Sequence, residues 1–108
     1  MRALLLALSV GCAPALDVAG EVAFGAALAA DYVQTRQITR DGYEGNPLIG
    51  RWGERTSPEA YFAAAALLHA GVAILLPRPW RQVWQGGWCV VEGVAVWNNY
   101  VDGYTFDW

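Results

Sequence analysis

The chain places several polar side chains that could bind a ligand in one short stretch. Asp31 and Thr35 are four residues apart, so both project from the same face of a helix. A Glu-x-Asn-Pro sequence follows, in which Glu44 and Asn46 are two residues apart. An Asn before a Pro is typical of a turn whose side chain accepts from nearby backbone amides. Asp31, Thr35, Glu44 and Asn46 are therefore candidate binding residues, and a purely structural role in the loop is the alternative.

Two further polar side chains lie in apolar surroundings. His69 is in the middle of an uncharged segment, and Glu92 is in the short apolar run 88–97. Because an unpaired polar group is costly in lipid, we expect His69 to contact a polar partner on a neighbouring helix, such as Asp31, Glu92 or Asn98. A proton-responsive role is the functional alternative for both residues. One His with scattered carboxylates does not have the spacing of a zinc site, so we expect no metal and no cofactor.

No common catalytic motif occurs in the sequence. The nucleophile elbow, the His-Glu-x-x-His zinc motif, the Walker loop and the dinucleotide-binding motif are all missing. Ser9 and Ser57 are the available serines, and they lie in a leader-like segment and at a predicted helix start. We therefore expect a non-enzymatic protein. A membrane enzyme using Asp31, Glu44 and His69 is the weakest alternative.

The composition indicates a protein of the membrane. Hydrophobic residues make up 56% of the chain and charged residues 16%, against roughly 45–50% and about 25% in soluble domains. Six Trp and five Tyr suit a chain with two water–lipid boundaries. The seven basic residues are too scattered to follow a phosphate backbone, which argues against nucleic acid as a partner. The expected partner is the lipid bilayer, and the expected location is the bacterial inner membrane.

Residues 1–15 have the outline of an export leader. A positive start and an apolar run precede Ser-Val-Gly-Cys, which is similar to the bacterial lipobox, where the Cys receives a lipid. Cys12 is therefore a candidate for lipidation. An uncleaved N-terminal membrane helix and ordinary cleavage near residues 13–15 are the alternatives. Pro14 predicts an interruption of the helix at this point.

Residues 16–108 predict a single helical membrane domain. We expect helices at about 16–38, 58–76 and 80–100, with Asp17 near the first N-cap and Gly20 and Gly25 allowing close helix approach. Ser57 and Pro58 form a well-defined start for the second helix, whose residues 60–76 carry no formal charge. That length is at the lower limit for a membrane span. The expected fold class is all-α, a small three-helix membrane-associated bundle preceded by a signal-like N-terminal helix.

Two further patterns concern the membrane boundaries. Trp80, Trp84 and Trp88 recur every four residues and share a helix face, as an interfacial anchor or a core seam would. The loop at residues 39–56 is rich in Gly and, with Arg36 at its edge, carries four arginines. Loops rich in basic residues remain on the cytoplasmic side of the membrane, which predicts that this loop is cytoplasmic. On the opposite side only Arg78 and Arg81 are basic.

The order of Asp31, Thr35 and the Glu-x-Asn-Pro turn resembles a family of small uncharacterised membrane proteins of bacteria and their phages. In that family an Asp and a Thr late in a helix are followed by a Gly, Glu-x-Asn-Pro and a small hydrophobic residue. The Tyr61-Phe62 helix with His69 and the Pro-flanked turn at residues 78–81 are similar to the phage-encoded members. The resemblance covers residues 30–99. It implies the architecture of a small membrane protein, but the family has no established activity that it could imply for this chain.

These observations lead to two main hypotheses for function. The first is a non-enzymatic integral membrane protein or lipoprotein, related to phage or prophage, that acts by association with itself as a homo-oligomer or with another membrane protein. The second is a membrane-tethered module that binds a ligand or a protein through the loop containing Asp31, Glu44 and Asn46.

Overall fold

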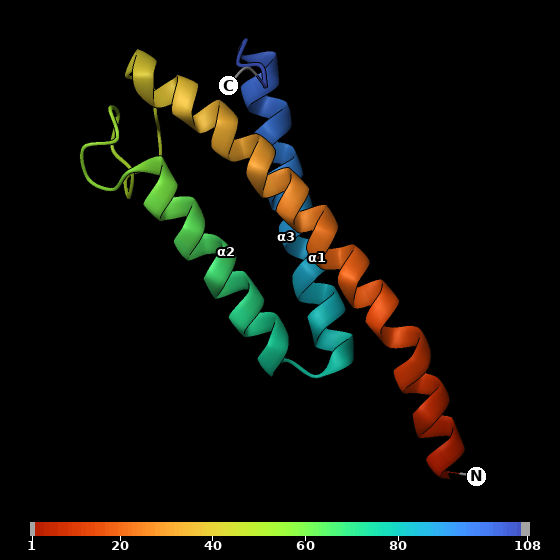
Figure 1. Ribbon diagram of the computed structural model, residues 1–108. Coiled ribbons are helices and arrows are strands. Elements are labelled where there is room, and N and C mark those ends of the chain that lie inside the picture. Colours follow the sequence, from red (N-terminus) through yellow and green to blue (C-terminus); the bar gives the residue numbers. More distant parts are fainter. Residues whose placement is uncertain (1, 107–108) are drawn as a thin grey trace.

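The computed structural model describes the backbone of residues 2–106 and the side chains of residues 17–106. This part of the chain forms three helices and no strand: α1 (Arg2–Asp41), α2 (Pro58–Leu75) and α3 (Arg78–Val101). Helix α2 runs antiparallel to α1, and α3 returns alongside α1 in the same direction as α1 (Figure 1). The predicted all-α fold with three helices is confirmed.

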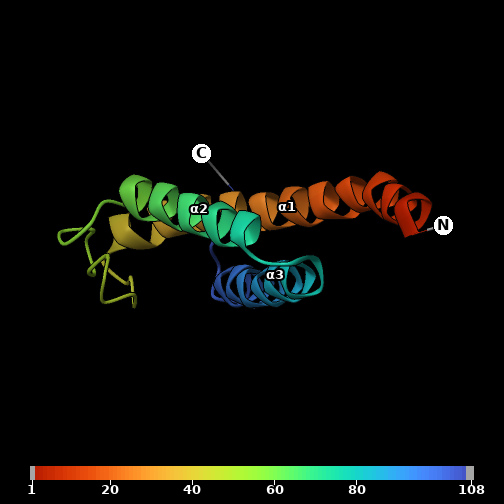
Figure 2. The same ribbon diagram turned by 90° about the horizontal axis from the view of Figure 1, so that it is seen from below.

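Helix α1 is longer than the sequence predicts. It contains 40 residues and continues through Pro14 into the segment expected as a leader. Its first turns project beyond the connection between α2 and α3 (Figure 2). Asp17 therefore lies inside the helix, and its predicted position at an N-cap is wrong. The side chain of Cys12 lies outside the described residues, so lipidation and cleavage stay predictions.

Helix α2 begins as predicted. The backbone N of Ala60 donates to Ser57 Oγ at 3.1 Å, Pro58 occupies the first turn, and Glu59 complements the positive helix end. The helix has 18 residues with a mean hydropathy of 1.4, and 17% of them are buried. Helix α2 is therefore long and apolar enough to span a membrane. Its low burial distinguishes it from the covered central helix of a soluble core.

Helix α3 packs tightly against α1 at Gly20. A Cβ atom at this position would lie 2.5 Å from Oε1 of Gln85, so only a glycine fits without displacing that side chain. The predicted role of Gly20 in close helix approach is confirmed. The same prediction for Gly25 is wrong, because its Cβ direction meets no atom within 4 Å.

Alanine at these two glycines is expected to have opposite effects on stability. Gly20→Ala should destabilise the bundle by about 1–3 kcal/mol, because the added methyl group must displace Gln85. Gly25→Ala adds the same group in open space of the same helix, and it should be neutral or stabilising by up to about 1 kcal/mol. Denaturant unfolding of the two solubilised variants measures the difference. Equal unfolding midpoints would contradict the packing of α3 against Gly20.

Many large apolar side chains are exposed and several polar side chains are buried, which is unusual for a water-soluble domain. Large apolar side chains on α2 and α3 point outward, among them Leu67, Leu75 and Val90 with exposures of 76%, 85% and 66%. Several polar side chains are buried instead: Gln34, Thr35, Thr39, His69 and Gln85. The buried apolar residues that pack in one cluster are few: Phe24, Leu28, Ile49 and Phe62. Polar contacts therefore make up much of the interface between the helices.

Candidate functional site

The Glu-x-Asn-Pro segment forms a hydrogen-bonded turn over the end of α1. The backbone N of Asn46 donates to Glu44 Oε1 at 2.7 Å, and the backbone N of Leu48 donates to Asn46 Oδ1 at 2.9 Å. Pro47 has no N–H, so two side-chain acceptors satisfy every amide from 46 to 48. The predicted turn, with the Asn46 side chain accepting from the backbone, is confirmed. The turn also fixes both side chains relative to α1.

A second turn completes the loop. The backbone N of Trp52 donates to Glu54 Oε2 at 2.8 Å. Hydrogen bonds from the amides of Glu54 itself and of Trp52 lower the pKa of the Glu54 carboxyl. The ionised Glu54 carboxyl therefore stabilises the loop fully at pH values above the ordinary pKa of Glu. This stabilisation is lost as the pH falls through the lowered pKa of Glu54. Gly50, at φ +82°, lies where a Cβ would collide with the Glu54 carboxylate.

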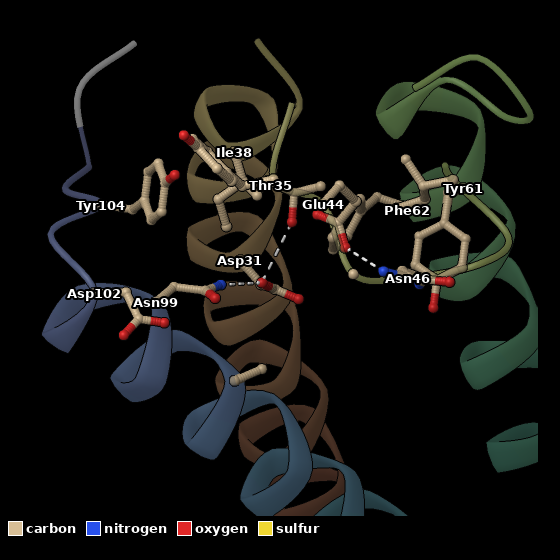
Figure 3. Close-up of a pocket in the computed structure, with 14 residues that line it drawn as sticks. Asp31, Thr35, Ile38, Glu44, Asn46, Tyr61, Phe62, Asn99, Asp102 and Tyr104 are labelled. Atoms are coloured by element: carbon tan, nitrogen blue, oxygen red, sulfur yellow. Dashed lines mark hydrogen bonds between the residues drawn. The ribbon is translucent and has the colours of Figure 1, made fainter. Parts of the chain in front are cut away.

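A pocket of about 440 Å³ opens between this loop and the three helices (Figure 3). It unites four of the six predicted site residues: Asp31 and Thr35 from α1, and Glu44 and Asn46 from the loop. The sequence analysis did not identify the remaining polar and aromatic lining residues, which come from the loop, α2, α3 and the C-terminal segment: Tyr43, Tyr61, Phe62, Asn99, Asp102 and Tyr104. We call this cavity the acidic pocket.

A hydrogen-bond network between α1 and α3 holds Asp31 in the acidic pocket. Asn99 Nδ2 donates to Asp31 Oδ1 at 3.0 Å, and Thr35 Oγ1 lies 3.5 Å from the same oxygen. The predicted projection of Asp31 and Thr35 from one helix face is confirmed. Gln34, which is fully buried, extends the network by donating to the backbone O of Val96 and of Tyr104, each at 3.2 Å. The position of Asp31 thus depends on contacts from α3 and from the C-terminal segment.

The acidic pocket carries negative charge and aromatic surface. Three of its lining residues have carboxyl groups, Asp31, Glu44 and Asp102, and none of the 14 is basic. Partial desolvation, followed by the charge of nearby carboxylates, raises the pKa of the Tyr104 phenol, which therefore remains neutral at physiological pH. Aromatic rings beside carboxylates form a suitable environment for an organic cation.

The remaining predicted polar residues, His69 and Glu92, do not line the acidic pocket. The His69 ring is 3% exposed and stacks on Phe24 with ring centroids 3.6 Å apart. Its Nδ1 lies 3.2 Å from Oε2 of Glu21. Glu92 lies on α3 within hydrogen-bonding reach of Asp31, and its buried Oε2 has no hydrogen-bond partner within the described residues.

The predicted partner of His69 is therefore wrong. The sequence analysis expected Asp31, Glu92 or Asn98, whereas the structure places Glu21 beside the imidazole. The reason is the antiparallel course of α2, which brings the middle of this helix to the level of Glu21 and not to the level of the loop. Glu21 is a polar group on another helix, as expected, but neither ring nitrogen of His69 makes a hydrogen bond with the described residues.

The tryptophan stripe of α3 has more than one role. Trp84 Nε1 donates to the backbone O of His69 at 3.2 Å, and its ring packs on the His69 ring. Trp88 contacts Trp84 edge to face. Trp80 is 63% exposed. Trp84 is thus a packing residue between α2 and α3, and Trp80 remains available as an interfacial anchor.

The sequence analysis did not predict the contact that joins all three helices. Arg81 on α3 lies 2.7 Å from Oδ2 of Asp17 on α1. Its other nitrogens donate to carbonyl groups at the end of α2, to Ala73 O at 2.6 Å and to Leu76 O at 3.1 Å. Acidic residues in α1 and basic residues at the start of α3, each within an otherwise apolar segment, are the signal that could have indicated this pair.

No protein-family model, curated protein or solved structure matches the chain. The resemblance to the family of small bacterial and phage membrane proteins stays a prediction. Among the described side chains, no group of three or more His, Cys, Asp or Glu residues is placed to hold a metal ion.

Proposed function

We propose that the chain is a small, non-enzymatic integral membrane protein of the bacterial inner membrane that binds a small organic cation in the acidic pocket. The observation that carries the ligand class is the combination of three carboxyl groups, aromatic walls and no basic side chain in one cavity. A cation would compensate the charge of Asp31 and Glu44 and would contact the rings of Tyr61 and Tyr104.

Insertion into lipid is supported by the outward position of the apolar side chains. A helix in lipid satisfies its own backbone hydrogen bonds, and its polar side chains turn toward the protein interior. Helix α2 meets the length and hydropathy requirements for a span. The buried polar side chains Gln34, His69 and Gln85 lie between the helices, where lipid cannot contact them.

The acidic pocket also has the properties of a preformed site. Its volume of about 440 Å³ falls within the range of roughly 300–1,000 Å³ for small-molecule sites. Asp31 is oriented by Asn99, and Glu44 is oriented by the amide of Asn46. Binding therefore needs little ordering of side chains, which favours affinity.

The test uses the purified full chain in detergent micelles with choline as the probe. Choline is compared with 3,3-dimethyl-1-butanol, an uncharged molecule of similar shape, at constant ionic strength. We expect titration calorimetry to detect choline binding and no binding of the alcohol, and we expect NMR shifts of the Tyr61 and Tyr104 rings. Asp31→Asn should weaken choline binding by about tenfold or more, because it removes the attraction between two unit charges, which is about 4 kcal/mol at about 4 Å near a protein surface.

Asp41→Asn is the matched control for this experiment. Asp41 is an exposed carboxyl at the end of α1 that does not line the acidic pocket, although its charge acts on Tyr104, so its loss should weaken choline binding much less than Asp31→Asn does. Equal binding of choline and the alcohol, or equal effects of Asp31→Asn and Asp41→Asn, would contradict a cation site. The polar residues of the acidic pocket would then have a structural role only.

A further inference from the structure

The outward face of α3 carries an uninterrupted heptad pattern. Its positions are separated by four and three residues in turn: Val83, Gly87, Val90, Val94, Trp97 and Val101. All six are exposed, and the five side chains have exposures from 54% to 66%. They lie on the side of the helix opposite Gln85 and Glu92, which face α1. We call this surface the α3 seam.

The spacing of the α3 seam matches the pattern by which two helices pack together. Contact with lipid requires apolar side chains but no particular repeat, whereas a seven-residue repeat keeps one stripe facing a partner helix. A Cβ atom added at Gly87 or at its neighbour Gly86 would meet no atom within 4 Å. The backbone of another helix can therefore approach closely at this point.

The order of large and small residues favours an antiparallel pairing of the α3 seam with itself. When two copies are opposed head to tail, Trp97 faces Gly87, Val90 faces Val94, and Val83 faces Val101. The largest residue of the seam then lies opposite the smallest, and the other layers pair valine with valine. A parallel pairing would place Trp97 on Trp97 and Gly87 on Gly87, which would overfill one layer and leave a void in another.

We infer that two copies of the chain form an antiparallel homodimer through the α3 seam, with opposite orientations in the membrane. The inference rests on the membrane insertion proposed above. The same surface is used on both copies, as a two-fold axis requires.

The arginine distribution supports the presence of both orientations. Four arginines lie at the loop end of the bundle, Arg36, Arg40, Arg51 and Arg55, and two at the opposite end, Arg78 and Arg81. Arg2 lies beyond them, at the projecting start of α1. Orientation in the bacterial inner membrane follows the difference in basic residues between the two sides. A difference of two arginines, or of one when Arg2 is included, gives only a weak preference. The expected cytoplasmic location of the loop then applies to one of the two copies.

Cysteine cross-linking in membranes tests the dimer. Cys12 and Cys89 are first replaced by Ala, and Val83→Cys and Val101→Cys are introduced in separately tagged chains that are co-expressed. In the antiparallel dimer Val83 faces Val101 of the other copy, whereas the two Val83 positions are separated by about 27 Å along the helix axis. We expect a disulfide between the two differently tagged chains, at least about tenfold more abundant than in either variant alone.

Exchange of the large and small residues provides a second measurement. Gly87→Trp alone and Trp97→Gly alone each disturb a layer of the antiparallel seam, whereas the double variant restores a large residue opposite a small one. We expect the mixed disulfide to fall in both single exchanges and to return in the double exchange. A return of the mixed disulfide in the double exchange would show that the single exchanges disturb the interface and do not unfold the chain.

Each outcome has a defined meaning. Cross-linking of Val83→Cys with itself would indicate a parallel pair, and the absence of any cross-link would indicate that the α3 seam contacts lipid; both results overturn the antiparallel dimer. Alkaline extraction of the same membranes tests insertion separately. A chain released by alkali contradicts the proposed membrane location, whereas an inserted chain without the mixed disulfide contradicts only the dimer.

Discussion

Arg81→Ala is expected to destabilise the protein by about 1.5–3 kcal/mol, because it removes the charged hydrogen-bond donor of a partly buried ion pair in which Arg81 is 27% exposed. Asp17, whose side chain is 18% exposed, would keep a carboxylate without its counterion. The carbonyl groups of Ala73 and Leu76 would also lose their donor. The connection between α2 and α3 would then separate from α1. Denaturant unfolding in micelles and the steady-state amount of protein in membranes measure the effect.

Arg51→Ala is the matched control for the loss of a guanidinium. Arg51 is an exposed loop residue, and its replacement should change stability by no more than about 0.5 kcal/mol. The double variant Asp17→Ala/Arg81→Ala should be more stable than the sum of the single effects predicts, because neither charge is then left alone. Equal stability of the Arg81→Ala and Arg51→Ala proteins would contradict the ion pair.

Leu68→Arg is expected to reduce membrane insertion of the chain. Leu68 lies in the middle of α2 and is 67% exposed, so the new charge would face hydrocarbon in an inserted protein. Exchange of Leu for Arg at the centre of a span costs about 3 kcal/mol, or roughly a 100-fold smaller inserted fraction. In water the same exchange at an exposed position would have little effect. The variant therefore discriminates between the two environments.

The amount of protein that resists alkaline extraction measures this effect. Leu48→Arg is the control, since Leu48 is an exposed loop residue with a similar exposure of 64%, and it should extract like the unaltered chain. If Leu68→Arg also accumulated and extracted like the unaltered chain, α2 would not face lipid.

The features that the sequence predicted well depend on contacts within a few residues. The start of α2 follows from Ser57 and Pro58, whose capping requires only the first turn. The loop turn follows from the spacing of Glu44 and Asn46, which bond to amides within two residues. The helical character of all three segments and most of their ends could also be predicted. The continuation of α1 through Pro14 could not, because a proline signal favours interruption.

The acidic pocket could be predicted only in part because its walls come from distant segments. The sequence indicated Asp31, Thr35, Glu44 and Asn46, which lie within 16 positions of one another. Asn99 and Tyr104 lie in the site because of how α3 and the segment after it are aligned along α1. No local pattern encodes that alignment. The pairing of His69 with Glu21 was missed for the same reason, since it depends on how far α2 descends along α1.

The small apolar core also determines how protons could move through the protein. Phe24 and Leu28 lie on α1 between Glu21, which contacts His69, and Asp31, which contacts Asn99. Their side chains are 4% and 7% exposed and pack in one cluster with Phe62. This layer interrupts the chain of hydrogen-bonding groups along the bundle. In the membrane location proposed above, a membrane containing the protein should therefore retain its electrochemical gradient.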